Sequence, residues 1–241
     1  MAELYLIRHA QASFGTSDYD RLSPLGCRQA GALGEYFRDC AIHFDAVYSG
    51  ELERQRKTAK IVLGLQPDNV HHEIDPRLNE IEIDKVFEHL VPQLVETSSN
   101  LENFVKEGKH SSKDYQKALE IVFKHWVTSD NDYPNLQSWA EYSGNVHRAL
   151  AEIVANEGSG KTVGVFTSGG TIATVVAHVL GVTGNQVYNF YEPLMNCSVT
   201  RLLYLSLIHI SEPTRPERIG VGGVLVVKKR GGGGGGGGGG G

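Results

Sequence analysis

Short apolar runs alternate with longer amphipathic segments along the first 204 residues, and this alternation most constrains the fold. Five runs are predicted to be strands: Glu3 to Ile7, Asp45 to Tyr48, Val70 to Ile74, Lys161 to Phe166 and Cys197 to Tyr204. Helices are predicted between them, near residues 23–37, 51–63, 136–156 and 171–180. Such alternation is typical of a mostly parallel sheet covered on both faces. The expected fold is a three-layer α/β domain over residues 1–204, with a helical cap inserted at residues 81–136.

The end of the chain does not fit this pattern. Residues 231–241 are an unbroken run of glycine, which has no side chain to bury and much backbone entropy to lose. The preceding stretch from Leu205 to Arg215 resembles a translated sequencing-library adapter. We therefore interpret residues 205–241 as a disordered, non-native tail and expect the genuine chain to break off near Tyr204, short of its natural end.

The tail changes the charge of the chain. The tail holds five of the 23 basic residues and two of the 28 acidic ones. Without it, 18 basic and 26 acidic residues remain, a formal charge of −8. An acidic chain without a Lys/Arg cluster argues against nucleic acid or an anionic membrane as partner. Neither a transmembrane run nor a signal peptide is recognisable. The three cysteines are odd in number and scattered, which favours a reducing, cytoplasmic setting, and no metal-ligand spacing is found.

Chemically active side chains follow the predicted strands. The first strand runs into Arg8 and His9, a guanidinium that could hold phosphate oxygens beside an imidazole that could attack phosphorus or carry a proton. Ligands of open α/β sheets gather at the carboxyl ends of strands. An Arg-His pair can also simply begin a loop, and by itself this short motif favours that structural interpretation, because short motifs have high false-positive rates.

Three further strand ends carry comparable residues. Arg54 lies about one turn into the helix after the second strand, and Glu80 follows the third. The fourth runs into Ser168, Gly169 and a helix, whose first N–H groups could bind an anion. Each feature could be structural by itself, but four at successive strand ends indicate one phosphate site.

This arrangement resembles the histidine phosphatase superfamily, the phosphoglycerate-mutase-like fold, over residues 3–204. The matching stretches are 6–9, 22–30, 49–59, 78–80, 169–170 and 196–200. The resemblance implies that His9 becomes phosphorylated and that Arg8 and Arg54 clamp the phosphoryl oxygens. It also implies that Glu80 protonates the leaving alcohol and then deprotonates the attacking water, without any cofactor. A carboxyl group in that role needs a raised pKa.

Two positions depart from the family pattern. Ala10 replaces a glycine, which only narrows the backbone choices. Ser168 replaces the family's second histidine, so a charged donor to the phosphoryl group becomes a neutral hydroxyl. Losing such a donor costs roughly two to three orders of magnitude in rate. If the site is otherwise intact, Ser168→His is expected to raise activity, and Gly169 is expected to contribute its N–H to phosphate binding.

Three functions remain open at this point. The favoured one is a cofactor-independent phosphomonoester hydrolase acting on a small phosphorylated substrate. The second is a catalytically weak or inactive member that binds a phosphorylated ligand or a protein partner. The third is a phosphoglycerate-mutase-type phosphotransferase, which would require a more basic pocket. The substrate and the oligomeric state are not indicated by the sequence.

Overall fold

The computed structural model describes residues 2–13, 20–67, 69–107, 112–129, 133, 135–182, 184–204 and 224–225. A six-stranded sheet with the order β3-β2-β4-β1-β5-β6 forms its centre. These strands are β1 (Ala2–Arg8), β2 (Ala46–Ser49), β3 (His72–Ile74), β4 (Thr162–Thr167), β5 (Val199–Tyr204) and β6 (Val224–Leu225). The pairs from β3 to β1 are parallel, and β5 runs antiparallel to both of its neighbours. The predicted mostly parallel sheet is therefore confirmed.

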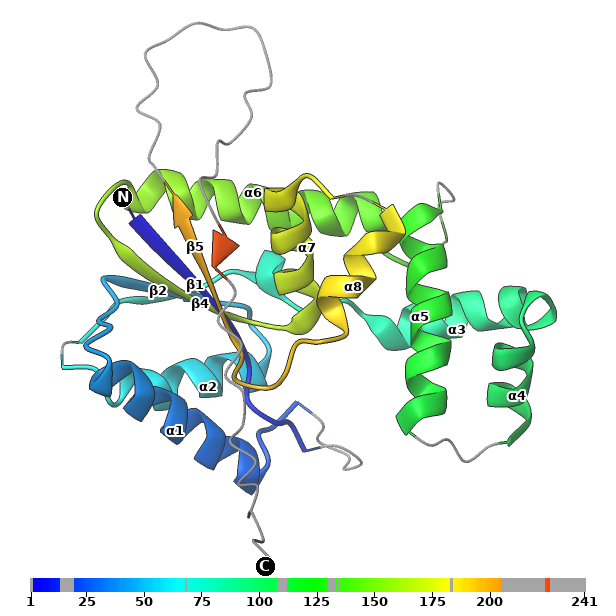
Figure 1. Ribbon diagram of the computed structural model, residues 1–241, viewed down its shortest axis with the longest axis horizontal. Coiled ribbons are helices and arrows are strands. Elements are labelled where there is room, and N and C mark those ends of the chain that lie inside the picture. Colours follow the sequence, from blue (N-terminus) through cyan, green and yellow to red (C-terminus); the bar gives the residue numbers. More distant parts are fainter. Residues whose placement is uncertain are drawn as a thin grey trace, which may run out of the picture.

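Helices cover both faces of the sheet, as Figure 1 shows. One layer holds α1 (Pro24–Asp39) and α2 (Glu53–Leu63), and the other holds α6 (Trp139–Glu157), α7 (Gly169–Leu180) and α8 (Tyr188–Tyr191). Strand β1 shows why, because its successive side chains point to opposite faces. Tyr5 and Ile7 pack with α1 and α2, while Leu4 and Leu6 belong to the core on the other face. The expected three-layer α/β fold is confirmed.

The two helices of the first layer begin in different ways. Ser23 caps α1 by accepting the Gly26 N–H at 2.9 Å, and Pro24 occupies its first turn, as the sequence predicted. A Cβ on Gly26 would lie only 2.1 Å from the Gln11 carbonyl oxygen, so glycine is required where α1 meets the loop after β1. Helix α2 has no cap from its own Leu52, and it begins two residues later than predicted.

Three helices lie beside the sheet as an inserted cap (Figure 1). They are α3 (Ile83–Leu94), α4 (Ser99–Glu107) and α5 (Ser112–Thr128), with a short 3₁₀ turn at Val95–Thr97 between the first two. Two further 3₁₀ turns lie outside the insertion, at Pro76–Leu78 before α3 and at Gly184–Val187 between α7 and α8. Aromatic rings join the cap to the main domain. Phe123 of α5 lies 5.5 Å from the ring of Tyr191 in α8, and Trp126 lies 5.4 Å from Trp139 in α6. The cap thus continues the core of the α6–α7 layer.

The tail expected at residues 205–241 lies outside the described residues except for β6. Val224 and Leu225 pair with Leu202 and Arg201 of β5, which differs at these two residues from the expected absence of secondary structure. Pairing there satisfies backbone groups at the free edge of β5. The origin of the tail stays a prediction.

Candidate active site

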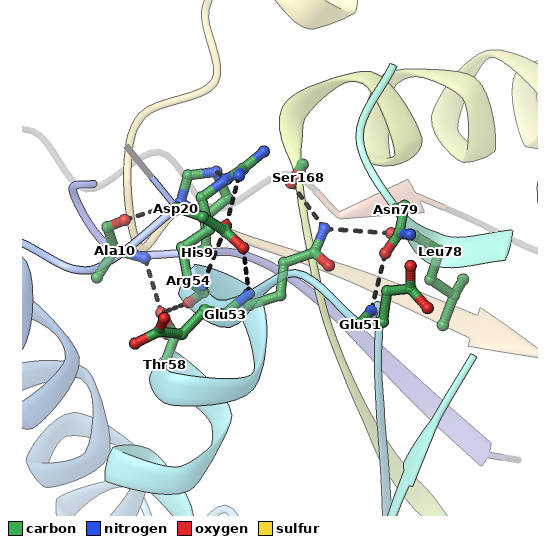
Figure 2. A network of polar contacts seen from close by, with 11 residues as sticks. His9, Ala10, Asp20, Glu51, Glu53, Arg54, Thr58, Leu78, Asn79 and Ser168 are labelled. Carbon is green, nitrogen blue, oxygen red and sulfur yellow. Dashed lines mark hydrogen bonds and ion pairs between the residues drawn. The ribbon is translucent and has the colours of Figure 1, made fainter. Parts of the chain in front are cut away.

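Three of the predicted site residues, His9, Arg54 and Ser168, lie at one edge of the sheet, where β1, β2 and β4 end (Figure 2). Arg8 pairs with Thr167 across the parallel strands β1 and β4, so His9 and Ser168 are the next residues on adjacent strands. The His9 N–H donates to the Thr167 carbonyl oxygen at 2.8 Å. Neighbouring strands are about 4.8 Å apart, which places these two residues side by side.

The imidazole of His9 is buried and held in one tautomer. Its Nδ1 lies 2.8 Å from the Ala10 carbonyl oxygen, which can only accept, so Nδ1 carries the proton. Its Nε2 accepts from Arg54 Nε at 3.2 Å and is therefore unprotonated, with its lone pair directed at the guanidinium. Burial, with the positive charges of Arg54 and Arg8, lowers the pKa of His9 to about 3, although the Ala10 contact and Asp20 oppose this. His9 is a neutral imidazole at physiological pH.

Arg54 is anchored by an acidic residue from another segment. Its Nη1 lies 2.7 Å from Asp20 Oδ1, and its side chain is 9% exposed. The Asp20 carboxylate also accepts the backbone N–H of Glu53 at 2.7 Å, at the start of α2. Asp20 thus replaces the missing local cap of α2 and fixes the guanidinium against His9 (Figure 2).

Arg8 lies beside the amino terminus of α7. Its Nη1 donates to the Leu194 carbonyl oxygen, while its buried Nε has no hydrogen-bond partner among the described residues. A Cβ on Gly169 would lie 3.2 Å from the Tyr191 ring and 3.7 Å from Arg8 Cζ, so glycine allows close packing here. Gly169 is the first residue of α7, where an N–H has no partner within the helix. An unpaired guanidinium N–H and a helix terminus are suited to an anion.

Glu80 is fixed by two backbone N–H groups. Its Oε1 accepts from Ile81 at 3.0 Å and from Gly170 at 2.9 Å. A Cβ on Gly170 would lie 2.3 Å from that oxygen, so only glycine fits. Burial raises the pKa of Glu80, although both hydrogen bonds and the charges of Arg8 and Arg54 oppose it. A carboxyl group that keeps its proton can act as a general acid.

Ser168 is fully buried at the end of β4 and does not cap α7 with its side chain. Its Oγ accepts a hydrogen bond from Gln55 Nε2 at 2.8 Å. Gln55 follows Arg54 in α2 and is fully buried as well. The replacement of a histidine by Ser168 therefore coincides with a polar contact to α2.

Backbone contacts hold the loop that carries His9. The Ala10 N–H donates to Thr58 Oγ1 at 3.0 Å, and Asn196 Nδ2 donates to the His9 carbonyl oxygen at 3.1 Å. Ala10 is fully buried in this loop. These contacts fix the backbone on both sides of the imidazole, which preorganises its direction.

The structure brings His9 and Arg54 into direct contact, and it places Arg8 and Glu80 against the two glycines that open α7. The sequence prediction missed Asp20, Gln55 and Asn196. The first two contact Arg54 and Ser168 across 34 and 113 residues, so no local motif could reveal them. The described residues contain no cluster of three His, Cys, Asp or Glu side chains able to hold a metal ion, and none of their helices is long and apolar enough to cross a membrane.

A comparison with protein families shows which family the chain belongs to. The sequence profile of the histidine phosphatase superfamily (branch 1) matches residues 4–99 and 103–206. The chain belongs to the histidine phosphatase superfamily. The family resemblance predicted from its motifs is therefore confirmed.

Solved structures of other histidine phosphatase-like proteins share this fold. A phosphoserine phosphatase of Entamoeba histolytica superposes with a TM-score of 0.57 at 20% identity, covering 85% of this chain and 91% of that one. A Bacillus stearothermophilus protein named YhfR superposes with a TM-score of 0.59 at 20% identity, covering 85% of this chain and 92% of that one. A mycobacterial glucosyl-3-phosphoglycerate phosphatase superposes with a TM-score of 0.56 at 20% identity, covering 84% of this chain and 90% of that one. At this identity the likeness shows the fold alone.

A curated relative matches a shorter stretch. A broad-specificity phosphatase of Saccharomyces cerevisiae is 38% identical over 66 residues, which are 25% of this chain and 29% of that protein. The chain thus aligns with less than a third of that relative's length.

Proposed function

We propose that the chain is a phosphomonoester hydrolase that works through a phosphohistidine at His9. The observation that carries this proposal is the state of the imidazole: Nδ1 is protonated, while Nε2 is unprotonated and its lone pair faces the Arg54 guanidinium. A neutral imidazole is a nucleophile, and a guanidinium is suited to hold phosphoryl oxygens. Membership of the histidine phosphatase superfamily and the phosphatase names of its relatives support the assignment.

In the first step, Nε2 of His9 attacks phosphorus and the bond to the alcohol oxygen breaks. The substrate takes the place of Nε2 as the partner of Arg54 Nε, while Asp20 still holds Arg54 Nη1. Arg8 approaches from the other side with an N–H that has no partner among the described residues. The two guanidinium groups would neutralise charge on the equatorial oxygens, which dominates catalysis of phosphoryl transfer.

Glu80 would supply and recover the proton. Its Oε1 accepts two backbone N–H groups, so the proton belongs on Oε2, from which it passes to the leaving alkoxide. The resulting carboxylate then takes a proton from the water that attacks the phosphohistidine. The P–N bond breaks, inorganic phosphate leaves, and both His9 and Glu80 return to their initial state.

Trapping of the intermediate tests this proposal. The chain is mixed with a ³²P-labelled phosphomonoester and quenched, using a panel that includes phosphoserine and glucosyl-3-phosphoglycerate, the compounds named for two relatives. We expect an acid-labile, base-stable label on the chain, which His9→Ala abolishes together with turnover. His43→Ala, at an exposed position after α1, is the matched control and should leave both unchanged. Turnover that survives in His9→Ala would contradict the covalent mechanism.

One feature favours a second function, a weak or inactive member that binds a phosphorylated ligand or a partner. Ser168 supplies a neutral hydroxyl where the family resemblance implies a charged imidazole. Isothermal titration calorimetry with the same panel separates the two functions. Saturable binding without release of inorganic phosphate would favour the binding function over the hydrolase.

A further inference from the structure

Gln55 is a buried polar residue for which the mechanism above has no use. It is fully buried in α2, immediately after Arg54 and directly beside Ser168. Its Nε2 lies 2.8 Å from Ser168 Oγ and 3.3 Å from the Leu78 carbonyl oxygen. Its Oε1 is buried and has no hydrogen-bond partner among the described residues. A buried amide with an unpaired oxygen costs stability, so the fold gains little from a glutamine here.

The Leu78 carbonyl oxygen fixes the orientation of this amide. That oxygen can only accept hydrogen bonds, and it also accepts from Thr167 Oγ1 at 2.5 Å. The Gln55 atom that faces it must therefore be the NH₂ group, because two carbonyl oxygens would repel each other. The other hydrogen of the same NH₂ group points to Ser168 Oγ.

It follows that Ser168 accepts from Gln55 and keeps its own hydroxyl hydrogen for another group. Across the parts of the chain that the structure describes, no atom accepts a hydrogen bond from Ser168 Oγ. The register of β1 and β4 places Ser168 next to His9, on the edge where the phosphoryl group would lie. The free hydroxyl hydrogen is thus available to a phosphoryl oxygen.

We infer that Gln55 is a positioning residue that holds Ser168 as a hydrogen-bond donor to the transferred phosphoryl group. Its NH₂ group occupies the Ser168 lone pair, prevents the hydroxyl from turning toward α2, and polarises the O–H bond through the chain of hydrogen bonds. This inference rests on the proposed function, because the hydroxyl acts on a phosphoryl group at His9. Ser168 and Gln55 form one functional unit in place of a single charged side chain.

A double-mutant cycle in the full chain tests this unit. Gln55→Met keeps the side-chain volume but cannot donate, and Ser168→Ala removes the hydroxyl. Hydrolysis of para-nitrophenyl phosphate and the Kd of orthovanadate, which mimics the pentacovalent phosphorus, are measured for both variants and for the pair. We expect kcat/KM to fall about 100-fold in Ser168→Ala, as for one lost transition-state donor, and about 10-fold in Gln55→Met. The double variant should be no slower than Ser168→Ala, and the fall should lie mainly in kcat.

Stability separates positioning from a structural role. Gln55→Met removes an unpaired buried oxygen, so its Tm should equal or exceed that of the unchanged chain while its activity falls. Gln66→Met is the matched control. Gln66 also bonds the backbone through its side-chain amide, at Phe44 and Ile42, but lies beyond the end of α2 away from the site. This control should keep full activity.

The inference would be overturned if the two single variants lose kcat/KM independently, so that the loss in the double variant is the product of the two single losses. It would also be overturned if Gln55→Met has a lower Tm than the unchanged chain, because its lost activity would then be explained by lost stability. If the unchanged chain binds orthovanadate without turning over substrate, the proposed hydrolase function fails. The Kd of orthovanadate for the same three variants then still decides the role of Gln55, since the unchanged chain should bind orthovanadate more tightly than any variant that lacks Gln55 or Ser168.

Discussion

In the proposed mechanism His9 must be neutral to attack phosphorus. Its surroundings favour the neutral imidazole, and this lowers the stability of the fold at acidic pH. The folded chain protonates this side chain only near its pKa of about 3, whereas an unfolded histidine takes up a proton near 6.5. Between these values the unfolded state binds more protons, so the free energy of unfolding falls as the pH falls through this window. The lowered pKa that would suit His9 to nucleophilic attack therefore makes the fold sensitive to acid.

Replacing His9 should remove this part of the acid sensitivity. We predict that His9→Gln loses about 3 kcal/mol less stability than the unchanged chain between pH 6.5 and pH 4, since each pH unit is worth about 1.4 kcal/mol. Urea unfolding at a series of pH values measures the difference. His147, whose pKa is lowered to about 4, titrates in both chains and cancels. Parallel stability curves would show that the pKa of His9 is not lowered.

The contact between Ser168 and Gln55 changes the expected effect of restoring a histidine. The sequence suggested that Ser168→His would raise activity, but the Gln55 amide lies 2.8 Å from Ser168 Oγ. An imidazole cannot enter without displacing a buried side chain, and such overpacking costs about 1–3 kcal/mol.

We therefore predict that Ser168→His alone lowers kcat/KM, while the pair Ser168→His and Gln55→Ala raises it above the Ser168→His value by at least about tenfold. Steady-state kinetics and circular dichroism of the three chains measure this. A gain in Ser168→His alone would mean that Gln55 moves away freely.

Helix α2 depends on a carboxylate from outside its own sequence. Asp20 accepts the Glu53 N–H at 2.7 Å and pairs with Arg54, so one side chain caps the helix and holds the guanidinium that we propose binds phosphate. A hydrogen-bonded cap contributes about 1 kcal/mol, and losing the ion pair adds to this because the Arg54 guanidinium is buried while Asp20 is partly exposed. The position of Arg54 therefore depends on the loop between β1 and α1.

Two substitutions at position 20 separate the cap from the charge. We predict that Asp20→Ala lowers the free energy of unfolding by about 1–3 kcal/mol and weakens orthovanadate binding. Asp20→Asn keeps an oxygen for the Glu53 N–H but loses the charge that faces Arg54, so it should recover only about 1 kcal/mol of that loss while vanadate binding stays weak. Chemical denaturation and vanadate titration give both quantities. Equal stability of all three chains would show that Asp20 does not cap α2.

At the scale of elements, the sequence predicted most strands and helices but not their starts. Periodicity and the Ser23-Pro24 pair located α1, because those signals are local. The start of α2 was placed at Glu51 rather than Glu53, because its cap comes from Asp20, and the Glu51 N–H instead donates to Asn79 Oδ1 at 2.8 Å. For the same reason the site residues at strand ends could be predicted, whereas partners from distant segments could not.

For the whole molecule, the sheet explains why residues from four segments form one site. Four parallel strands end at the same edge, and β5 returns in the opposite direction to close the other side of β1. The Arg8 N–H bonds the Ser198 carbonyl oxygen at 3.0 Å, so the turn before β5 also supports the residue next to His9. The family match extends to residue 206, just beyond the end of β5.

The boundary of the domain is the last prediction. Residues 2–204 contain both apolar cores, and β6 adds only two paired residues at the outer edge of β5. Such a short pairing contributes less than about 1 kcal/mol net, which for a domain of this size corresponds to about 2–4 °C in Tm. We expect a chain ended after Tyr204 to melt within about 3 °C of a chain ended after Lys228, which keeps β6, and to show the same activity. Calorimetry of these two chains and of the full chain measures it. A Tm that falls well beyond this range without residues 205–228 would show that they belong to the fold, and the interpretation of the tail as non-native would be wrong.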